Sequence, residues 1–193
     1  MVKVCGSVPV GVILSKAEEV NAVARVRDAG AGAILPLIES AAGFEHVRAI
    51  AAAPGVERLL FGSIDFQLDL GIRGEHEELL FFRSQLVLVS RLAGIGAPVD
   101  GVTTSIGDDG RLGADTTHAR QMGFGGKLCI HPKQVGAVNR LFSPGEEEVA
   151  WARRVLEAAA ASDGAAVALD GKMVDRPVIL RAQRIVDEAG AAG

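Results

Sequence analysis

The chain has 193 residues, of which 49% are hydrophobic and 23% charged, with 24 glycines and a formal net charge of −4. This length and composition predict a globular protein with a sizeable core and exclude an intrinsically disordered chain. The small net charge and scattered lysines and arginines exclude a DNA- or RNA-binding surface, and no apolar run approaches the roughly 18 residues that would span a bilayer.

Five short apolar runs are predicted to form strands. The first lies in the opening stretch MVKVCGSVPVGVIL, which glycine and proline interrupt and which no small-residue cleavage site follows, so it is interpreted as a strand and not as a signal peptide. Because the runs lack strict alternation with polar residues, they are typical of strands in a parallel sheet covered by helices. Pro36, in the second run, lacks an N–H group and is expected at a sheet edge or a bulge. The predicted strands are residues 8–14, 33–38, 58–62, 99–104 and 126–130.

A helix is predicted between the first two strands. Ser15 and Glu18 form a capping box ahead of the pattern KAEEVNAVARVRDAG, and Gly30 is placed to end that helix. The alternation of strand and helix patterns defines an α/β chain.

A long helix is also predicted after the last strand, in the stretch SPGEEEVAWARRVLEAAAA. Ser143 and Glu146 form its capping box, and Pro144 is expected at the first helical position. Trp151 is interpreted as a packing residue. The predicted buried stripe of this helix is Val149, Ala152, Val155, Leu156 and Ala159.

The spacing of the strands limits the number of possible architectures. The first three strand centres are about 25 residues apart, which suits βα units with right-handed crossovers. Five such units fit either an open doubly wound sheet or most of a (β/α)8 barrel. A complete barrel typically needs about 250 residues, so the chain is too short for one.

The cysteines indicate the compartment. Cys5 and Cys129 are the two cysteines of the sequence, and neither belongs to a C-x-x-C pair. A disulfide framework and a zinc knuckle are therefore not expected, and a reducing cytoplasm is predicted.

Two acidic residues follow neighbouring predicted strands. Glu39 and Asp65 lie where each strand ends, and active sites of parallel α/β proteins gather at that end. Because no histidine stands beside them at metal-ligand spacing, a shared cation would be held by oxygen ligands, which favours Mg²⁺ or Mn²⁺ over zinc. Gly62 and Ser63 are small and would let a substrate approach the backbone. The alternative is that each acid caps the next helix or pairs with an arginine.

Several motifs in the chain resemble those of one known family. The stretches GVILSKAEEVNAV, LPLIESAAGFEHVRAIAAAPGVERLLFGSIDFQLDLGI, GFGGKLCIHPKQV and GKMVDRPVILRAQRIV occur in the order found in citrate lyase beta-subunit-like CoA-ester lyases of the HpcH/HpaI aldolase and citrate lyase superfamily. This resemblance implies a TIM barrel that binds Mg²⁺ and makes or cleaves C–C bonds in 3-hydroxyacyl-CoA thioesters. We therefore expect a partial (β/α)8 barrel over residues 1–142 and a C-terminal helical extension over residues 143–193, both in one domain.

The resemblance also implies roles for single residues. Glu39 of IES and Asp65 of SIDF match the metal-binding carboxylates, and Glu39 also lies near the substrate in the family. Asp175 of KMVD matches a catalytic acid/base, although an aspartate at this position is also an obvious helix N-cap. His131 of CIHPKQ matches a family signature and is a candidate contact to CoA.

Two lysines are further candidates on the CoA side. Lys127 and Lys133 are placed to meet CoA phosphates, and the alternative is that both are solvated surface lysines.

The resemblance starts at about the family's fourth strand. An arginine that grips the substrate in the family has no counterpart in this sequence, so turnover is expected to be impaired while metal binding remains. The alternatives to a CoA-ester lyase are an HpaI-type pyruvate aldolase and a non-catalytic remnant. The partners implied are acyl-CoA and oxo-acid substrates, with neither nucleic acid nor membrane, and a homo-oligomer, commonly a trimer in the family.

Overall fold

A computed structural model describes residues 11–161 and 167–191 of the chain. Contacts between Cα atoms divide it into two compact units, one ending at Val138 and the other beginning at Asn139. The predicted division at residue 142, and the grouping of both parts into one domain, stay predictions. Within the two described ranges, no helix is both long and apolar enough to span a membrane.

The first unit is built on a five-stranded sheet. All neighbouring strands are parallel, and their spatial order is the order in which they occur along the chain. A doubly wound sheet would reverse its order at one point, whereas a barrel adds each strand beside the last. The sheet is therefore a segment of a (β/α) barrel, as predicted. Its strands are β1 (Gly11–Leu14), β2 (Ala33–Ile38), β3 (Arg58–Phe61), β4 (Gly96–Asp100) and β5 (Gly126–Lys127).

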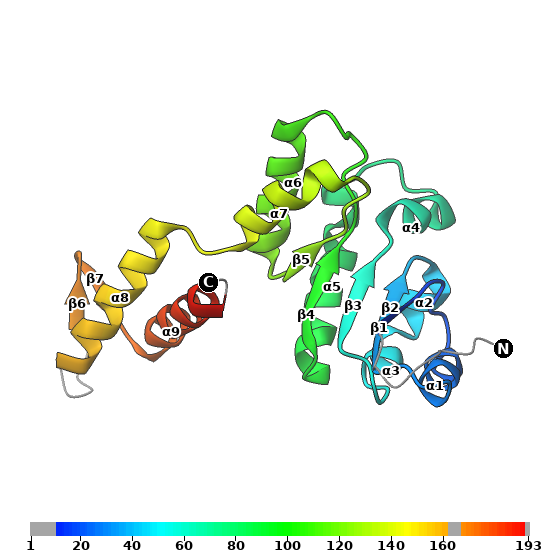
Figure 1. Cartoon of the computed structure of the whole chain (residues 1–193), viewed down its shortest axis with the longest axis horizontal. Coiled ribbons are helices and arrows are strands. Elements are labelled where there is room, and N and C mark those ends of the chain that lie inside the picture. Colours follow the sequence, from blue (N-terminus) through cyan, green and yellow to red (C-terminus); the bar gives the residue numbers. More distant parts are fainter. Residues whose placement is uncertain (1–10, 162–166, 192–193) are drawn as a thin grey trace. The chain divides into compact units, whose positions relative to one another are not determined.

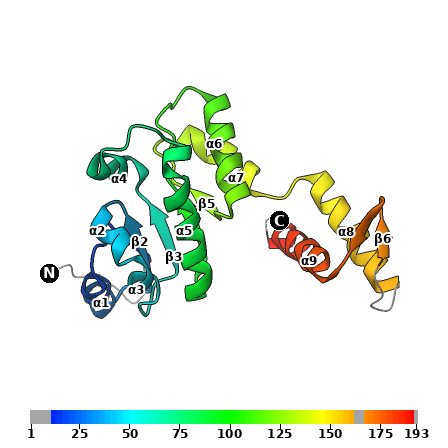
Figure 2. The same cartoon turned by 180° about the vertical axis from the view of Figure 1, so that it is seen from behind.

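Seven helices accompany this sheet in the described part of the unit. Of these, α1, α3, α5 and α6 make the main contacts with its strands, and α5 lies behind β4 in Figure 1 and in front of the sheet in the reverse view of Figure 2. The helices are α1 (Val20–Asp28), α2 (Ala41–Glu45), α3 (Val47–Ala51), α4 (Ser63–Leu70), α5 (Glu77–Ala93), α6 (Asp109–Met122) and α7 (Pro132–Phe142).

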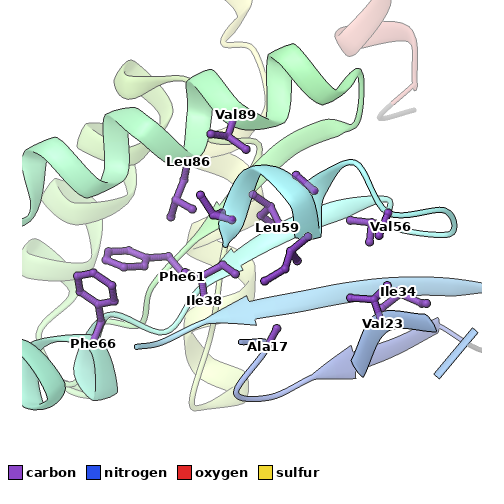
Figure 3. Packing of buried hydrophobic residues seen from close by; sticks show 14 of the residues in the cluster. Ala17, Val23, Ile34, Ile38, Val56, Leu59, Phe61, Phe66, Leu86 and Val89 are labelled. Carbon is purple, nitrogen blue, oxygen red and sulfur yellow. The ribbon is translucent and has the colours of Figure 1, made fainter. Parts of the chain in front are cut away.

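The hydrophobic core lies between the sheet and these helices. Ile34 and Ile38 of β2 point into it beside Phe61 of β3, and Leu86 of α5 closes it from above (Figure 3). The opposite side of the sheet is more open, since Ile13 of β1 is 58% exposed. The core of the described unit is therefore concentrated on one side of the sheet, as expected for part of a barrel wall.

The ladder between β2 and β3 is irregular beside Pro36. Ile34 lies opposite Val56, but Leu37 lies opposite Leu60, so the pairing slips by one residue between them. Ile34 exchanges hydrogen bonds with the β3 side, and Pro36, two residues further on, has no N–H to offer that side. A bulge at this position confirms one of the two expectations for a proline inside a strand.

The predicted fourth and fifth strands are wrong in their extents. β4 begins and ends earlier than residues 99–104, and β5 ends at Lys127. Thr103 was expected in a strand because it is β-branched, but side chains from other elements take its polar groups. Its hydroxyl donates to Asp115 and its carbonyl accepts from Gln134. The segment after β4 is thus a loop tied down by α6 and α7.

The capping box predicted for the first helix is also wrong. α1 begins at Val20 and no side chain caps it, whereas the carboxylate of Glu18 accepts a hydrogen bond from the hydroxyl of Ser40 at 2.8 Å. Gly30 follows the helix end with a φ of +97°, which confirms its predicted role as a terminator.

After the end of α7, the described residues of the second unit form two helices and a β-hairpin. Its helix α8 starts at Glu146, and Val149 donates its N–H to the carbonyl of Gly145, so the start predicted at Ser143 and Pro144 is wrong. The predicted stripe is confirmed at Ala152 and Val155, which are buried, and at Val149 and Leu156, which pack against them. The elements are α8 (Glu146–Ala161), β6 (Val167–Leu169), β7 (Lys172–Val174) and α9 (Arg176–Ala191).

The hairpin between β6 and β7 was not predicted. Asp170 and Gly171 form its turn, both with positive φ. An Asp-Gly pair between two short runs is the strongest short-range signal for such a turn, so this element could have been found from the sequence.

Candidate functional site

Glu39 follows the last residue of β2 and is only 8% exposed. One of its carboxylate oxygens, Oε1, accepts a hydrogen bond of 2.6 Å from the backbone N–H of Lys16. Lys16 adopts a φ of +47°, which is uncommon for a residue with a side chain and is found where surrounding structure holds the backbone. The carboxylate of Glu39 is therefore anchored on one side, and no described residue bonds its Oε2 atom.

Gly62 lies directly beside Glu39. It follows Phe61, whose partner on β2 is Ile38, and it donates its N–H to the Ile38 carbonyl at 2.9 Å. A Cβ atom at position 62 would lie 2.5 Å from the Cβ of Glu39, so only glycine fits there. The absence of a side chain at this position makes room for the acid.

Asp65 lies in the first turn of α4, three residues after Gly62. Its side chain is exposed and makes no hydrogen bond or ion pair with any described residue. Because β2 and β3 are parallel neighbours, Glu39 and Asp65 lie at the same end of the sheet, as predicted. An acid in the first turn also complements the helix dipole. The alternative interpretation, in which Asp65 only stabilises the start of its helix, is therefore also compatible with the structure.

The two carboxylates fit a hard divalent cation such as Mg²⁺ better than they fit zinc. The described residues contain no group of three or more His, Cys, Asp or Glu that could hold a metal ion. Zinc sites need three or four protein ligands, whereas Mg²⁺ is usually held by one or two carboxylates and completes its octahedron with water and substrate oxygens. Glu39 and Asp65 supply that number of oxygen donors.

Ser63 is the first residue of α4 and is buried. Its hydroxyl oxygen would lie 2.1 Å from a Cβ atom placed on Gly101, the residue after β4. The start of α4 is thus held between the ends of β2 and β4. The Ser63 side chain therefore faces the interior.

A buried charged cluster lies behind this site, and sequence reasoning missed most of it. Asp100, at the end of β4, accepts a hydrogen bond of 2.9 Å from Nε of Arg83 on α5, and its other oxygen lies 3.6 Å from Nζ of Lys127 on β5. Lys127 also donates to the carbonyl of Gly101 at 2.6 Å. The interpretations of Lys127 as a CoA phosphate contact or a solvated lysine are both wrong, because its side chain is only 2% exposed.

Burial changes the pKa values of two side chains in and near this cluster. Burial lowers the pKa of Lys127, and the carboxylates of Asp100 and Asp115 partly oppose that shift. Burial likewise raises the pKa of the Cys129 thiol, which is free. Cys5 lies outside the described residues.

Two hollows lie at opposite ends of the strands. A cavity of about 20 Å³, with room for about one water molecule, lies among Ser63, Asp100 and Lys127 at the carboxyl ends. A larger hollow of about 610 Å³ is bounded by Arg58 and Gly96, the first residues of β3 and β4. Because catalytic groups of barrels lie at the carboxyl ends, the larger hollow is not assigned to the site.

His131 precedes α7 and acts as a local cap. Its Nδ1 atom accepts a hydrogen bond of 3.1 Å from the backbone N–H of Lys133, so the neutral ring carries its proton on Nε2. That proton remains available to a ligand. The side chain of Lys133 is exposed, which is compatible with both interpretations offered for it.

Asp175 belongs to the second unit and caps α9. Its Oδ1 atom accepts a hydrogen bond of 3.2 Å from the N–H of Val178, three residues on, which confirms the capping interpretation. This leaves its Oδ2 atom for other chemistry. The predicted catalytic role stays a prediction, because Asp175 belongs to the second unit whereas Glu39 and Asp65 belong to the first.

Replacing Asp175 with alanine is expected to lower the free energy of unfolding of the second unit by about 1 kcal/mol, because the cap is lost. Asparagine caps as well as aspartate, so Asp175→Asn should restore that stability. Urea titration followed by fluorescence of Trp151, the single tryptophan, measures this unit directly. Equal losses for both substitutions would contradict the capping role.

Comparisons with known proteins agree with this arrangement. The model of the HpcH/HpaI aldolase/citrate lyase family matches residues 10–132. A citrate lyase subunit beta-like protein of Deinococcus radiodurans is 38% identical over 158 residues, which cover 79% of this chain and 55% of the relative. An L-malyl-CoA/beta-methylmalyl-CoA lyase of Cereibacter sphaeroides is 34% identical over 176 residues, 79% of this chain and 55% of the relative.

Solved structures give the same result. The crystal structure of the protein CitE from Mycobacterium tuberculosis, in complex with magnesium, acetoacetate and coenzyme A, is 32% identical and has a TM-score of 0.80. The match covers 93% of this chain and 68% of that one. This chain spans little more than half the length of several curated relatives that it matches. On the extent of the family match and these identities, the chain belongs to the HpcH/HpaI aldolase/citrate lyase family.

Proposed function

We propose that the protein is a Mg²⁺-dependent CoA-ester lyase that cleaves or forms a C–C bond in a 3-hydroxyacyl-CoA thioester. The observation that carries this proposal is the buried carboxylate of Glu39, anchored through one oxygen at the carboxyl end of β2, with Asp65 at the same end of the sheet. The names of the relatives, citrate lyase beta subunits and a malyl-CoA lyase, support this reaction class over a pyruvate aldolase.

The proposed metal ligands are Glu39 and Asp65, and the ion is Mg²⁺, which the related CitE structures contain. When bound, the ion supplies Lewis-acid stabilisation of negative charge on the oxygens of the oxo-acid product. Glu39 is fixed by the Lys16 N–H and by its contact with Gly62, so it needs no reorganisation on binding. The backbone at Gly62 and Ser63 is the proposed seat of the substrate.

The cleavage reaction has a simple balance. A base removes the proton of the 3-hydroxyl group, the oxygen becomes a carbonyl, and the bond between C2 and C3 breaks. Its electron pair passes to C2 as the thioester enolate, which takes up a proton to give an acyl-CoA. Asp175 is the proposed acid/base in this exchange, and the Nε2–H group of His131 is the proposed contact to CoA.

The proposal extends to the assembly and location of the protein. We expect a homo-oligomer in a reducing cytoplasm, with acyl-CoA and oxo-acids as partners. Asp175 would then serve a site completed by neighbouring chains.

Isothermal titration calorimetry with MgCl₂ in the presence of oxaloacetate tests the metal site. Glu39→Gln keeps the size of the side chain but removes its charge, so the dissociation constant for Mg²⁺ should rise by at least about 100-fold. The matched control is Glu45→Gln on the exposed side of α2, which should leave the constant unchanged. Absence of binding by the wild type, or equal binding by Glu39→Gln, would overturn the proposal.

A second assay separates the reaction classes. Release of acetyl-CoA from malyl-CoA or citryl-CoA is expected, with loss of activity in Asp175→Asn, which retains the helix cap. Activity on free hydroxy-acids alone would point to the pyruvate aldolase. Mg²⁺ binding without any cleavage would point to a non-catalytic remnant.

A further inference from the structure

The start of α4 is enclosed on two sides by glycines. On one side, Gly62 packs against Glu39, and on the other, Gly101 packs against Ser63. At position 101 a Cβ atom would meet both the hydroxyl and the Cβ of Ser63, at 2.1 and 2.8 Å. Asp65 is two residues further along the same helix, so the position of its carboxylate depends on where Ser63 is held.

A charged side chain bonds Gly101 directly, and a second one bonds the residue before it. The ammonium group of Lys127 donates to the Gly101 carbonyl at 2.6 Å, and Asp100 is fixed by Arg83 at 2.9 Å. Side chains from β5 and α5 therefore hold two consecutive residues, Gly101 and Asp100, at the end of β4. Hydrogen bonds from charged groups are directional and stronger than neutral ones, so they define a position more sharply than aliphatic contacts do.

A buried cluster of this kind is a costly way to stabilise a fold. Removing the charges of Lys127 and Asp100 from water is unfavourable, and apolar side chains of similar volume often stabilise a fold as well or better. Lys127 nevertheless lies deep in the interior with its ammonium group on a backbone carbonyl. The most direct effect of this hydrogen bond is to fix the position of Gly101.

We infer that Lys127 and Gly101 are positioning residues for Mg²⁺: Lys127 fixes Gly101, Gly101 fixes Ser63, and Ser63 sets the place of Asp65 relative to Glu39. Neither Lys127 nor Gly101 touches the ion, so both act through the helix that carries the ligand. The inference rests on the proposed function, because it concerns the same metal site.

The sharpest test uses the contact between Gly101 and Ser63. Gly101→Ala should raise the Mg²⁺ dissociation constant, measured by calorimetry with MgCl₂ and oxaloacetate, by about 10- to 100-fold, the usual cost of disturbing groups behind metal ligands. Adding Ser63→Gly removes both clashing atoms and should restore most of the affinity. The control Gly113→Ala, in α6 with nothing within 4 Å, should bind as the wild type does.

The variant Lys127→Met tests the same inference independently. It keeps most of the length of the side chain but loses the hydrogen bond to Gly101, so the dissociation constant should again rise by about 10-fold or more. Lys133→Met, at an exposed lysine, is the matched control. Circular dichroism shows whether each variant is folded.

The outcomes distinguish this inference from the function on which it rests. A wild type that binds no Mg²⁺ overturns both. A wild type that binds, with Gly101→Ala and Lys127→Met within 2-fold of it, overturns the positioning role alone. Failure of Ser63→Gly to rescue Gly101→Ala, or loss of folding in both single variants, also overturns it, because positioning predicts folded proteins with weakened binding.

Discussion

Arg83→Met is expected to lower the free energy of unfolding of the first unit by about 3–5 kcal/mol, the usual cost of removing one partner of a buried ion pair. The arginine side chain is 9% exposed, and its guanidinium group bonds both Asp100 and the carbonyl of Glu75. It also lies over the ring of Phe61, with 5.6 Å to the centroid. Methionine fills much of the volume but leaves the Asp100 carboxylate with Lys127 alone.

Far-UV circular dichroism during urea titration is the measurement, because the single tryptophan, Trp151, belongs to the second unit and does not report on the first. Arg91→Met, at an exposed position on the same helix, is the matched control and should change stability by less than about 1 kcal/mol. In Arg83→Met/Asp100→Asn, the loss should be smaller than the sum of the single losses. Additive losses would show that the two side chains do not depend on each other.

Gly62→Ala is expected to destabilise the first unit by about 1–3 kcal/mol and to displace Glu39. The new methyl group would lie 2.5 Å from the Cβ and 3.4 Å from the Cα of Glu39. These atoms belong to or adjoin the backbone, so no rotation of a flexible side chain can relieve the overlap. Gly62 has a φ of −85°, which any residue adopts, and the cost therefore comes from the close approach and not from backbone strain.

The same urea titration gives this cost, and a substitution elsewhere calibrates it. Gly113→Ala adds a methyl group in open space inside α6 and should stabilise the unit by about 0.5–1 kcal/mol, because alanine loses less conformational freedom on folding than glycine. Removing the obstructing atoms with Glu39→Gly in the Gly62→Ala background should recover part of the loss. A Gly62→Ala protein as stable as the wild type would contradict the close packing at this site.

The sequence was informative where a structural element depends on neighbours close along the chain. The apolar runs at residues 33–38 and 58–62 indicated parallel strands, and Gly30 marked a helix end. Glu39 and Asp65 could be singled out because the ends of parallel strands meet at one edge of a sheet. The irregularity at Pro36 followed from its missing N–H.

The rest depended on partners that are distant in the sequence. Glu18 was expected to cap its own helix, but Ser40 takes its carboxylate. Lys127 seemed a surface lysine because lysines are almost never fully buried without a partner, and that partner, Asp100, comes from another strand. No local sequence pattern indicates a pair whose two members lie on different strands. Arg83 was not singled out from the sequence, because its partner Asp100 lies on β4, against which α5 packs.

The strand order determines which strands of the first unit are protected from local unfolding. Within the described part of the chain, β3 has a paired strand on each side, whereas β1 pairs with β2 alone. Amide protons of β3 should therefore exchange with solvent deuterons only in large-scale unfolding, and those of β1 through local fraying. The carboxylate of Glu39, which rests on the turn after β1, would then be the part of the site most exposed to such fraying.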